Sequence, residues 1–202
     1  CSTFAVGLIN ALSNLKGKSL SKSELAYKAI KLEQDVLRES VGSQDQVAAA
    51  YGGFNVVQFL KTGEIRVTPA SVTPSRLNEL QSHLMLLYTG ESRNGTELAK
   101  TTIANIPKSK LVLRQMRTMV DKGVEIMENH DPISNFGKLL HKGWELKQAL
   151  NPLATSSHIN QIYKTATKHG AVGGKVLGSG GAGVVIPFVP PNKQRQLSEA
   201  LD

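Results

Sequence analysis

Apolar residues near the start of the chain recur at intervals of three and four positions, the spacing of one buried helix face. The first such run covers residues 5–15 and ends at Lys16-Gly17-Lys18. Ser21 and Glu24 have the spacing of a capping box, which predicts a second helix from there to about Leu37. A short Ala-rich helix around residues 45–50 is expected to follow.

The pattern after residue 53 predicts strands and then a long helical region. Residues 54–60 and 65–68 predict a hairpin that turns at Lys61–Glu64. Residues 74–80 indicate a short helix or turn, and residues 84–88 a buried strand. Between residues 96 and 168 the chain is predicted to be mostly helical, with prolines between the helices. One apolar stripe in this region is expected to be core: Phe136, Leu139, Leu140, Trp144, Leu146 and Leu150.

A glycine-rich segment near the C-terminus predicts a strand, a tight turn and a second strand over residues 173–190, before a closing helix at 193–201. Glycines let a backbone approach a ligand closely, and successive N–H groups can hold a phosphate. Hairpins also use glycine, so both interpretations stay open. Neither a Walker-type phosphate loop nor a dinucleotide-binding strand–glycine–helix unit is present.

The composition narrows the class of protein. With 202 residues, 40% hydrophobic and 5% aromatic, the chain fits one domain or two small ones of α/β or α+β type. The net charge of +8 favours anionic partners, but the basic residues are scattered and form no nucleic-acid motif, so a small phosphorylated ligand is expected. The histidines lack metal-ligand spacing, so no zinc site is predicted.

A single cysteine excludes an intrachain disulfide and fits a cytoplasmic location. The sequence has no signal peptide and no apolar run long enough for a membrane span, so no membrane partner is expected.

Two carboxylates are candidates for chemistry. Gly42 and Ser43 form a predicted entry turn, which places Asp45 near a helix N-terminus, where the helix dipole favours the ionised form. An ionised Asp in a pocket can accept a proton from a sugar hydroxyl; alternatively, Asp45 only interacts with the dipole. Glu33 lies near the end of the second predicted helix, where negative charge opposes the dipole and favours a bound cation. The alternative is a solvated acidic face.

Five stretches, in order along the whole chain, resemble the GHMP small-molecule kinases. Residues 2–12 resemble the helix that follows the Gly-Leu-Gly-Ser-Ser loop of the family's second motif, and residues 173–183 resemble its third motif. Residues 42–46 with 51–55, residues 88–93 and residues 144–147 resemble the subgroup that phosphorylates heptose 7-phosphate.

The resemblance implies a two-domain α+β kinase with ATP and Mg²⁺ between its domains. Residues 1–70 would be the remainder of an N-terminal ATP-binding domain, and residues 71–202 a C-terminal ferredoxin-like domain. Asp45 would be the catalytic carboxylate, and Glu33 with Ser2 the Mg²⁺ ligands. The remaining implied cofactor contacts are Ser2, Thr3, Gly178, Ser179, Gly180 and Gly181.

Four residues are predicted to hold the sugar phosphate. Gly42 and Gln44 belong to the motif around Asp45, whereas Arg93 and Lys175 are chosen because a fixed cation suits a phosphate dianion. Either cation could instead be a surface charge.

The chain departs from the family pattern at its start. The glycine part of the second motif is absent, and Cys1 stands where the family usually has Ser; a thiol is a poor Mg²⁺ ligand. We therefore expect the functional protein to include an upstream N-terminal segment.

The implied reaction is phosphorylation of the anomeric hydroxyl of D-glycero-D-manno-heptose 7-phosphate to the 1,7-bisphosphate. The alternatives are a kinase for galactose or fucose, an amidohydrolase with Cys1 as nucleophile, and a non-catalytic scaffold. The helix predicted directly after Cys1 counts against the amidohydrolase.

Overall fold

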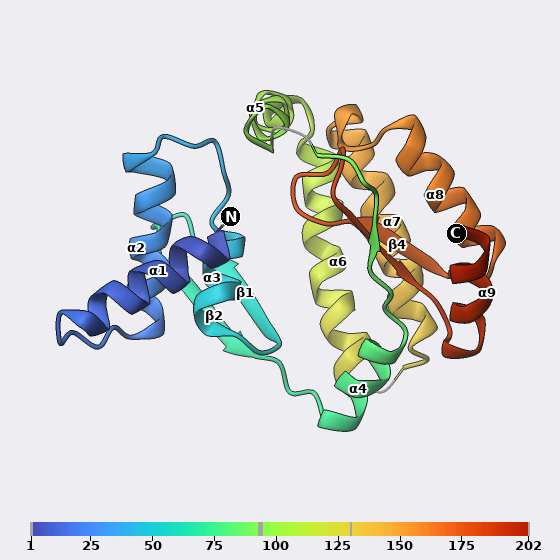
Figure 1. Ribbon diagram of the computed structural model, residues 1–202, viewed down its shortest axis with the longest axis horizontal. Coiled ribbons are helices and arrows are strands. Elements are labelled where there is room, and N and C mark those ends of the chain that lie inside the picture. Colours follow the sequence, from blue (N-terminus) through green and yellow to red (C-terminus); the bar gives the residue numbers. More distant parts are fainter. Residues whose placement is uncertain (1, 93–94, 130, 202) are drawn as a thin grey trace. The chain divides into compact units, whose positions relative to one another are not determined.

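The computed structural model describes residues 2–92, 95–129 and 131–201 of the chain. The chain divides into two compact units, Cys1–Pro69 and Ala70–Asp202 (Figure 1). Each unit has its own hydrophobic core. None of the described helices combines the length and the hydrophobicity needed to cross a membrane.

Three helices build the core of the N-terminal unit: α1 (Ser2–Leu15), α2 (Lys22–Lys31) and α3 (Gln44–Tyr51). Val6, Leu25 and Ala29 are buried together, and Ala49 and Ala50 pack against them. The predicted capping box at the start of α2 is confirmed, because the Ser21 hydroxyl accepts a hydrogen bond from the Glu24 N–H and the Glu24 carboxylate accepts one from the Ser21 N–H. Small side chains on α3 allow the three helices to pack closely.

The helix that begins with α2 continues as a π-helical turn, η1 (Leu32–Val36). The Leu37 N–H donates to the carbonyl of Leu32, five residues earlier, at 2.9 Å. The sequence predicted a helix to about Leu37 but not this wider turn. Such turns are rare and occur frequently at functional sites.

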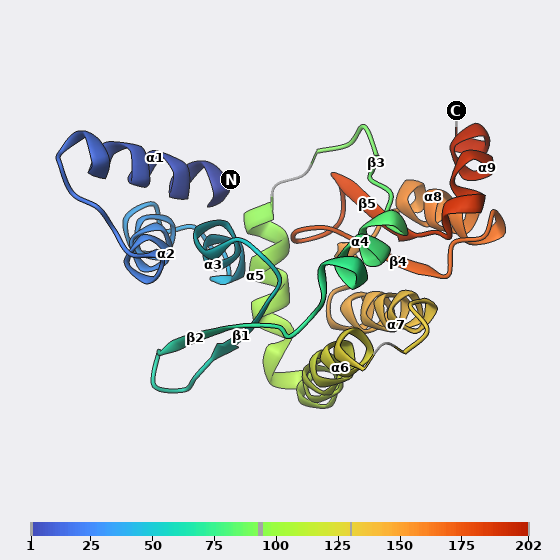
Figure 2. The same ribbon diagram turned by 90° about the horizontal axis from the view of Figure 1, so that it is seen from below.

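The predicted hairpin is confirmed as β1 (Asn55–Phe59) and β2 (Ile65–Pro69), which pair antiparallel with Val57 opposite Val67. Tyr27 of α2 holds the hairpin, because its hydroxyl donates to the Gly63 carbonyl and accepts from the Ile65 N–H at 3.1 Å. In Figure 2, α2 and α3 are seen almost end-on between α1 and the hairpin.

The C-terminal unit combines a small antiparallel sheet with several helices. Its strands are β3 (Leu87–Tyr88), β4 (Gly173–Val176) and β5 (Val184–Phe188), in the spatial order β3-β5-β4. Its helices are α4 (Pro74–Ser82), α5 (Gly95–Asn105), α6 (Lys110–Glu128), α7 (Ser134–Leu150), α8 (Ser157–Lys168) and α9 (Pro191–Leu201), with 3₁₀ turns η2 (Ile106–Lys108) and η3 (Pro152–Ala154). Helix α7 packs on β4, and α6 packs on α7. The predicted α+β class is confirmed.

The prediction of a buried strand over residues 84–88 was wrong. Only Leu87 and Tyr88 form a strand, and Leu84 makes an isolated bridge to Phe188. Strand β3 pairs with β5 at the edge of the sheet, and the side chains of Leu86 and Tyr88, two residues apart and so on the same face, are exposed to solvent. An apolar run alone does not distinguish an edge strand from a central one.

Helix α7 lies directly against the backbone of β4. A methyl group added to Gly173 would come within 2.0 Å of the Gly137 carbonyl oxygen, and one added to Gly137 would come within 2.6 Å of the Phe188 ring. The two glycines therefore set the distance between helix and sheet.

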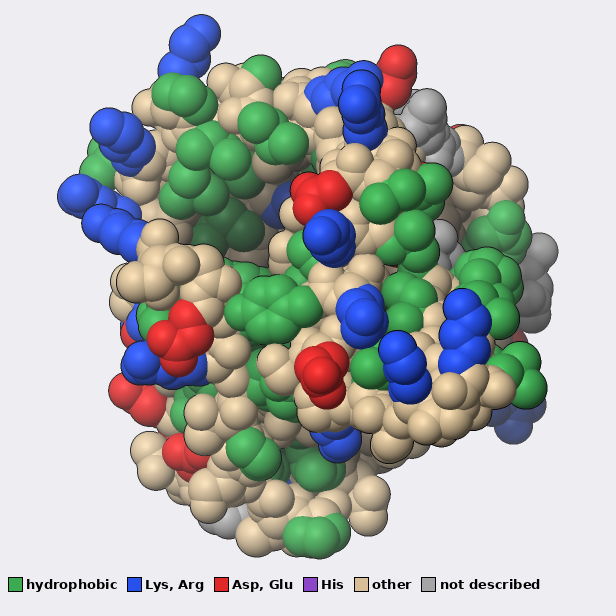
Figure 3. All heavy atoms as spheres, turned by 90° about the vertical axis from the view of Figure 1, so that its left-hand side faces the viewer, with side chains coloured by type: hydrophobic (Ala, Val, Ile, Leu, Met, Phe, Trp, Pro, Cys, Tyr) green, Lys and Arg blue, Asp and Glu red, His purple; other side chains and the backbone are tan. Residues whose placement is uncertain are grey.

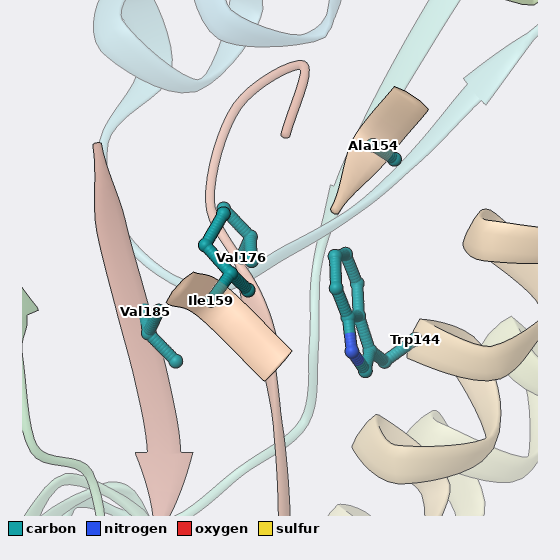
Figure 4. Packing of buried hydrophobic residues seen from close by; sticks show 5 residues of the cluster. All are labelled: Trp144, Ala154, Ile159, Val176 and Val185. Atoms are coloured by element: carbon teal, nitrogen blue, oxygen red, sulfur yellow. The ribbon is translucent and has the colours of Figure 1, made fainter. Parts of the chain in front are cut away.

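The core beside the sheet includes a cluster whose members come from five elements (Figure 4). The cluster comprises Trp144, Ala154, Ile159, Val176 and Val185. Trp144 belongs to the predicted apolar stripe on α7, so that part of the stripe is core.

Tyr163 packs on this cluster and makes the protein sensitive to high pH. Burial, together with the charge of Glu145, raises the pKa of the Tyr163 hydroxyl to about 12. A tyrosine in the unfolded chain titrates near pH 10, so the stabilisation by the neutral hydroxyl is complete below about pH 10 and is lost as the pH rises to about 12. We therefore expect the free energy of unfolding of the wild type, relative to Tyr163→Phe, to fall across this range. Urea unfolding of both proteins from pH 9 to 12 tests this, and a constant difference would contradict it.

Candidate functional site

Three elements of the N-terminal unit converge on the Glu33 carboxylate. Glu33 lies on the π-helical turn and is only 3% exposed. Its Oε2 atom accepts a hydrogen bond from the Ser2 hydroxyl of α1 at 2.9 Å and another from the Gln46 amide of α3. The structure thus brings together the two residues predicted to bind Mg²⁺, and it adds Gln46.

The environment of Glu33 suits a cation. A buried carboxylate is costly unless hydrogen bonds or an opposite charge compensate it, and within the described part of the chain no Lys, Arg or His forms an ion pair with Glu33. The solvated-face alternative is therefore wrong for Glu33, although Asp35, two residues later, is exposed. Hydroxyl and carboxylate oxygens are ligands that Mg²⁺ accepts.

Few protein ligands would surround such an ion. Among the described residues, no three His, Cys, Asp or Glu side chains are grouped so that they could hold a metal. Mg²⁺ usually keeps several waters and binds substrate phosphates, so one carboxylate and one hydroxyl fit this ion better than a metal that needs a full protein cage. The residues present therefore fit Mg²⁺ carried in with a nucleotide.

Asp45 is the second residue of α3 and is exposed. No described residue forms a hydrogen bond or an ion pair with its side chain. Gly42 and Gln44, the predicted substrate contacts beside it, are exposed as well. The side chain of Asp45 is therefore accessible from solvent.

The loop before α3 is held by Gln34, a residue that the sequence did not single out. Its amide nitrogen donates to the Val41 carbonyl at 3.0 Å and to the Ser43 hydroxyl at 3.1 Å. Gln34 lies on the same π-helical turn as Glu33, so this turn supports both the candidate metal ligand and the approach to Asp45. No local pattern signals this contact.

In the C-terminal unit, the glycine turn between β4 and β5 is anchored to the core cluster. The Gly181 N–H donates to the Ala154 carbonyl, and a methyl group on Gly180 would come within 2.6 Å of the same oxygen. Gly180 also has a φ of +98°, which side-chain-bearing residues rarely adopt. Gly178 and Ser179, at the tip, are exposed.

Two other stretches that resemble the kinases meet this turn. The Thr89 hydroxyl donates to the Gly183 carbonyl at 2.9 Å, and the Lys147 ammonium donates to the Gly178 carbonyl at 2.6 Å. The structure therefore brings residues 88–91, Lys147 and the turn together from distant parts of the sequence. Lys175 is half-buried on β4, and Arg93 lies outside the described residues, as does Cys1.

Comparison with known proteins gives one family. Residues 1–53 match the model of the GHMP kinases N terminal domain. The whole chain is 28% identical to D-glycero-alpha-D-manno-heptose 7-phosphate kinase of Campylobacter jejuni, over 99% of this chain and 59% of the relative. It is also 28% identical to mevalonate kinase of Pyrococcus horikoshii, over 98% of this chain and 56% of that relative.

A solved structure gives the same result. The fold matches the crystal structure of a D-glycero-D-manno-heptose 1-phosphate kinase from Bacteroides thetaiotaomicron with a TM-score of 0.67 and 27% identity, over 99% of this chain and 55% of that one. The chain thus spans somewhat more than half the length of the relatives that it matches. Residues 1–53 match the N-terminal domain of the GHMP kinases, and 98–99% of the chain is similar to a heptose 7-phosphate kinase and a mevalonate kinase.

Proposed function

We propose that this chain is part of an ATP-dependent sugar-phosphate kinase in which Asp45 accepts the proton of the attacking hydroxyl. The observation that carries the proposal is the arrangement on α3: Asp45 is exposed and unpartnered among the described residues, and Gln46, the next residue, hydrogen-bonds the buried Glu33. A base directly beside a residue that holds the candidate metal ligand fits phosphoryl transfer, which depends on positioning and charge neutralisation.

The other residues have roles in binding. Ser2 and Glu33 would hold Mg²⁺, which neutralises charge on the transferred phosphate when bound. Ser2 and Thr3, at the start of α1, and the turn residues Gly178–Gly181 are proposed nucleotide contacts. Gly42, Gln44, Arg93 and Lys175 are proposed contacts of the sugar phosphate. The glycine turn is anchored by a hydrogen bond to Ala154, which supports its proposed role in nucleotide binding, because a fixed loop loses little conformational freedom when a phosphate binds.

The proposed acceptor is the anomeric hydroxyl of D-glycero-D-manno-heptose 7-phosphate. Its support is the similarity to a heptose 7-phosphate kinase and to a solved heptose 1-phosphate kinase. Because a mevalonate kinase is equally similar at 28%, identity alone does not select the acceptor. The alternative is a GHMP kinase for an unphosphorylated sugar such as galactose or fucose.

A parallel ADP-release assay with heptose 7-phosphate, galactose, fucose and mevalonate tests the acceptor. We expect kcat/KM to be at least about 100-fold higher for heptose 7-phosphate, because the groups that bind the 7-phosphate would lose their partner with the other acceptors. Turnover of galactose or mevalonate without heptose 7-phosphate would refute the proposed substrate while leaving the kinase chemistry in place.

The apolar face of α1 bears on which protein should be assayed. Phe4, Leu8, Leu12 and Leu15 lie on this helix at intervals of three and four and are all exposed. Figure 3 shows hydrophobic side chains among basic and acidic ones on the face that it views. We propose that an upstream segment of the same protein covers this face in the active enzyme. The mass of the protein isolated from its source tests this, and a mass near 21.8 kDa with full activity would contradict it.

A further inference from the structure

We propose that Gln46 is the positioning residue of the cation site: its amide nitrogen fixes the Glu33 carboxylate, and its amide oxygen accepts a hydrogen bond from a water bound to the cation. This inference rests on the proposed kinase function, because it assigns a role within the same Mg²⁺·nucleotide site.

The first support is the burial and the fixed orientation of Gln46. The side chain is 0% exposed, and its Nε2 atom donates to Glu33 Oε2. The opposite amide orientation would place the Gln46 carbonyl oxygen against Glu33 Oε2, which accepts a hydrogen bond, so the orientation with Nε2 toward Glu33 is the one that fits this contact.

The second support is that the carboxylate is held from two sides through one atom. Glu33 Oε2 accepts from both Ser2 and Gln46. This fixes the plane of the carboxylate and satisfies Oε2, while Oε1 forms no hydrogen bond with the described residues. A carboxylate oriented in this way by neighbouring groups is the arrangement that metal-binding carboxylates generally require.

The third support is an unsatisfied acceptor. Gln46 Oε1 is buried and has no hydrogen-bond partner among the described residues. Buried polar atoms are nearly always paired, so one without a partner calls for an explanation. Mg²⁺ keeps several waters when it binds a nucleotide, and the hydrogens of these waters need acceptors. Gln46 Oε1 can be such an acceptor, and it belongs to the same amide whose nitrogen orients Glu33.

The placement of Gln46 also couples two functions. It directly follows Asp45 on α3, so the helix that presents the proposed base also carries the group that orients the proposed metal ligand. A shift of α3 therefore changes both at once.

Gln46→Met is the test, because it keeps the length of the side chain and removes both hydrogen bonds. In the protein as isolated from its source, we expect Mn²⁺ to bind the ADP complex at least tenfold more weakly, as measured by electron paramagnetic resonance. We expect the Mg²⁺ concentration that gives half-maximal turnover to rise by a similar factor, with a smaller change in kcat at saturating Mg²⁺. The matched control is Gln58→Met on β1, an exposed glutamine of the same unit outside the site.

The outcomes separate the two hypotheses. If the wild type binds Mn²⁺·ADP and Gln46→Met binds it equally well, the positioning role is overturned and the kinase assignment stands. If the wild type neither turns over any acceptor nor binds Mn²⁺·ADP, both are overturned.

A second measurement applies if Gln46→Met fails to fold. In the wild type, the side-chain amide resonances of Gln46 should shift when Mg²⁺ is added to the ADP complex. Unchanged resonances would overturn the proposal without any variant.

Discussion

Asp45→Asn is expected to lower kcat by about 10²- to 10⁴-fold, the usual contribution of a positioned general base, with little change in the KM for ATP. The amide has the size of the carboxylate but cannot accept the proton of the sugar hydroxyl. Because Asp45 is exposed and has no partner among the described residues, the substitution should leave the thermal unfolding midpoint nearly unchanged. Steady-state kinetics of ADP release together with circular dichroism measure both effects.

The matched control for this prediction is Asp35→Asn. Asp35 is also an exposed acidic residue of the N-terminal unit, two positions after Glu33, but it has no proposed role. Its substitution should leave kcat within a factor of about two, since surface changes away from a site have small effects. Normal turnover by Asp45→Asn would refute the catalytic assignment of Asp45.

Gly173→Ala is expected to have the largest effect on stability, a loss of roughly 3 kcal/mol or more in the free energy of unfolding. The added methyl group would come within 2.0 Å of the Gly137 carbonyl oxygen, and a backbone atom cannot move aside as a flexible side chain can. Helix α7 would have to move away from β4, which would loosen the core that anchors the glycine turn. Urea unfolding of the chain, followed by Trp144 fluorescence, measures the loss.

Gly143→Ala is the control for the same helix. A methyl group there would meet only the flexible end of Met119, at 3.3 Å. Because alanine favours helix formation over glycine, we expect Gly143→Ala to be neutral or up to about 1 kcal/mol more stable. If Gly173→Ala were as stable as the wild type, the direct contact between helix and strand would be wrong.

Features encoded by neighbouring residues could be predicted from the sequence. The capping box at Ser21 and the hairpin around Gly63 depend on contacts within a few residues, and both are confirmed. The two strands on either side of the glycine turn are confirmed as well. The extent of the strand at residues 84–88 was not predictable, because its pairing depends on which segments lie beside it and the burial of its side chains depends on what covers each face. Only the tertiary structure supplies that information.

In the candidate site too, local features could be predicted from the sequence, whereas contacts between distant residues could not. The position of Asp45 at a helix N-terminus follows from the local turn and the small residues after it. Glu33 contacts Ser2, which is 31 positions away in the sequence, and Gln46, which is 13 positions away. No local pattern encodes these contacts or the burial of Glu33. The one available signal for the contact with Gln46 was its place in the sequence, a polar side chain directly before the run of small apolar residues 47–50.

The π-helical turn at Leu32–Val36 has a consequence for how related proteins diverge. A π turn holds one residue more than an α turn, so deletion of a single residue there would restore a regular α-helix without breaking the chain. Because the extra residue is accommodated within the wider turn, its loss would change the direction of the side chains in that turn, so that Glu33 would no longer face Ser2 and Gln46. A one-residue gap at this point in a related sequence would then mark the loss of the proposed cation site, even where Ser2, Glu33 and Gln46 are all retained.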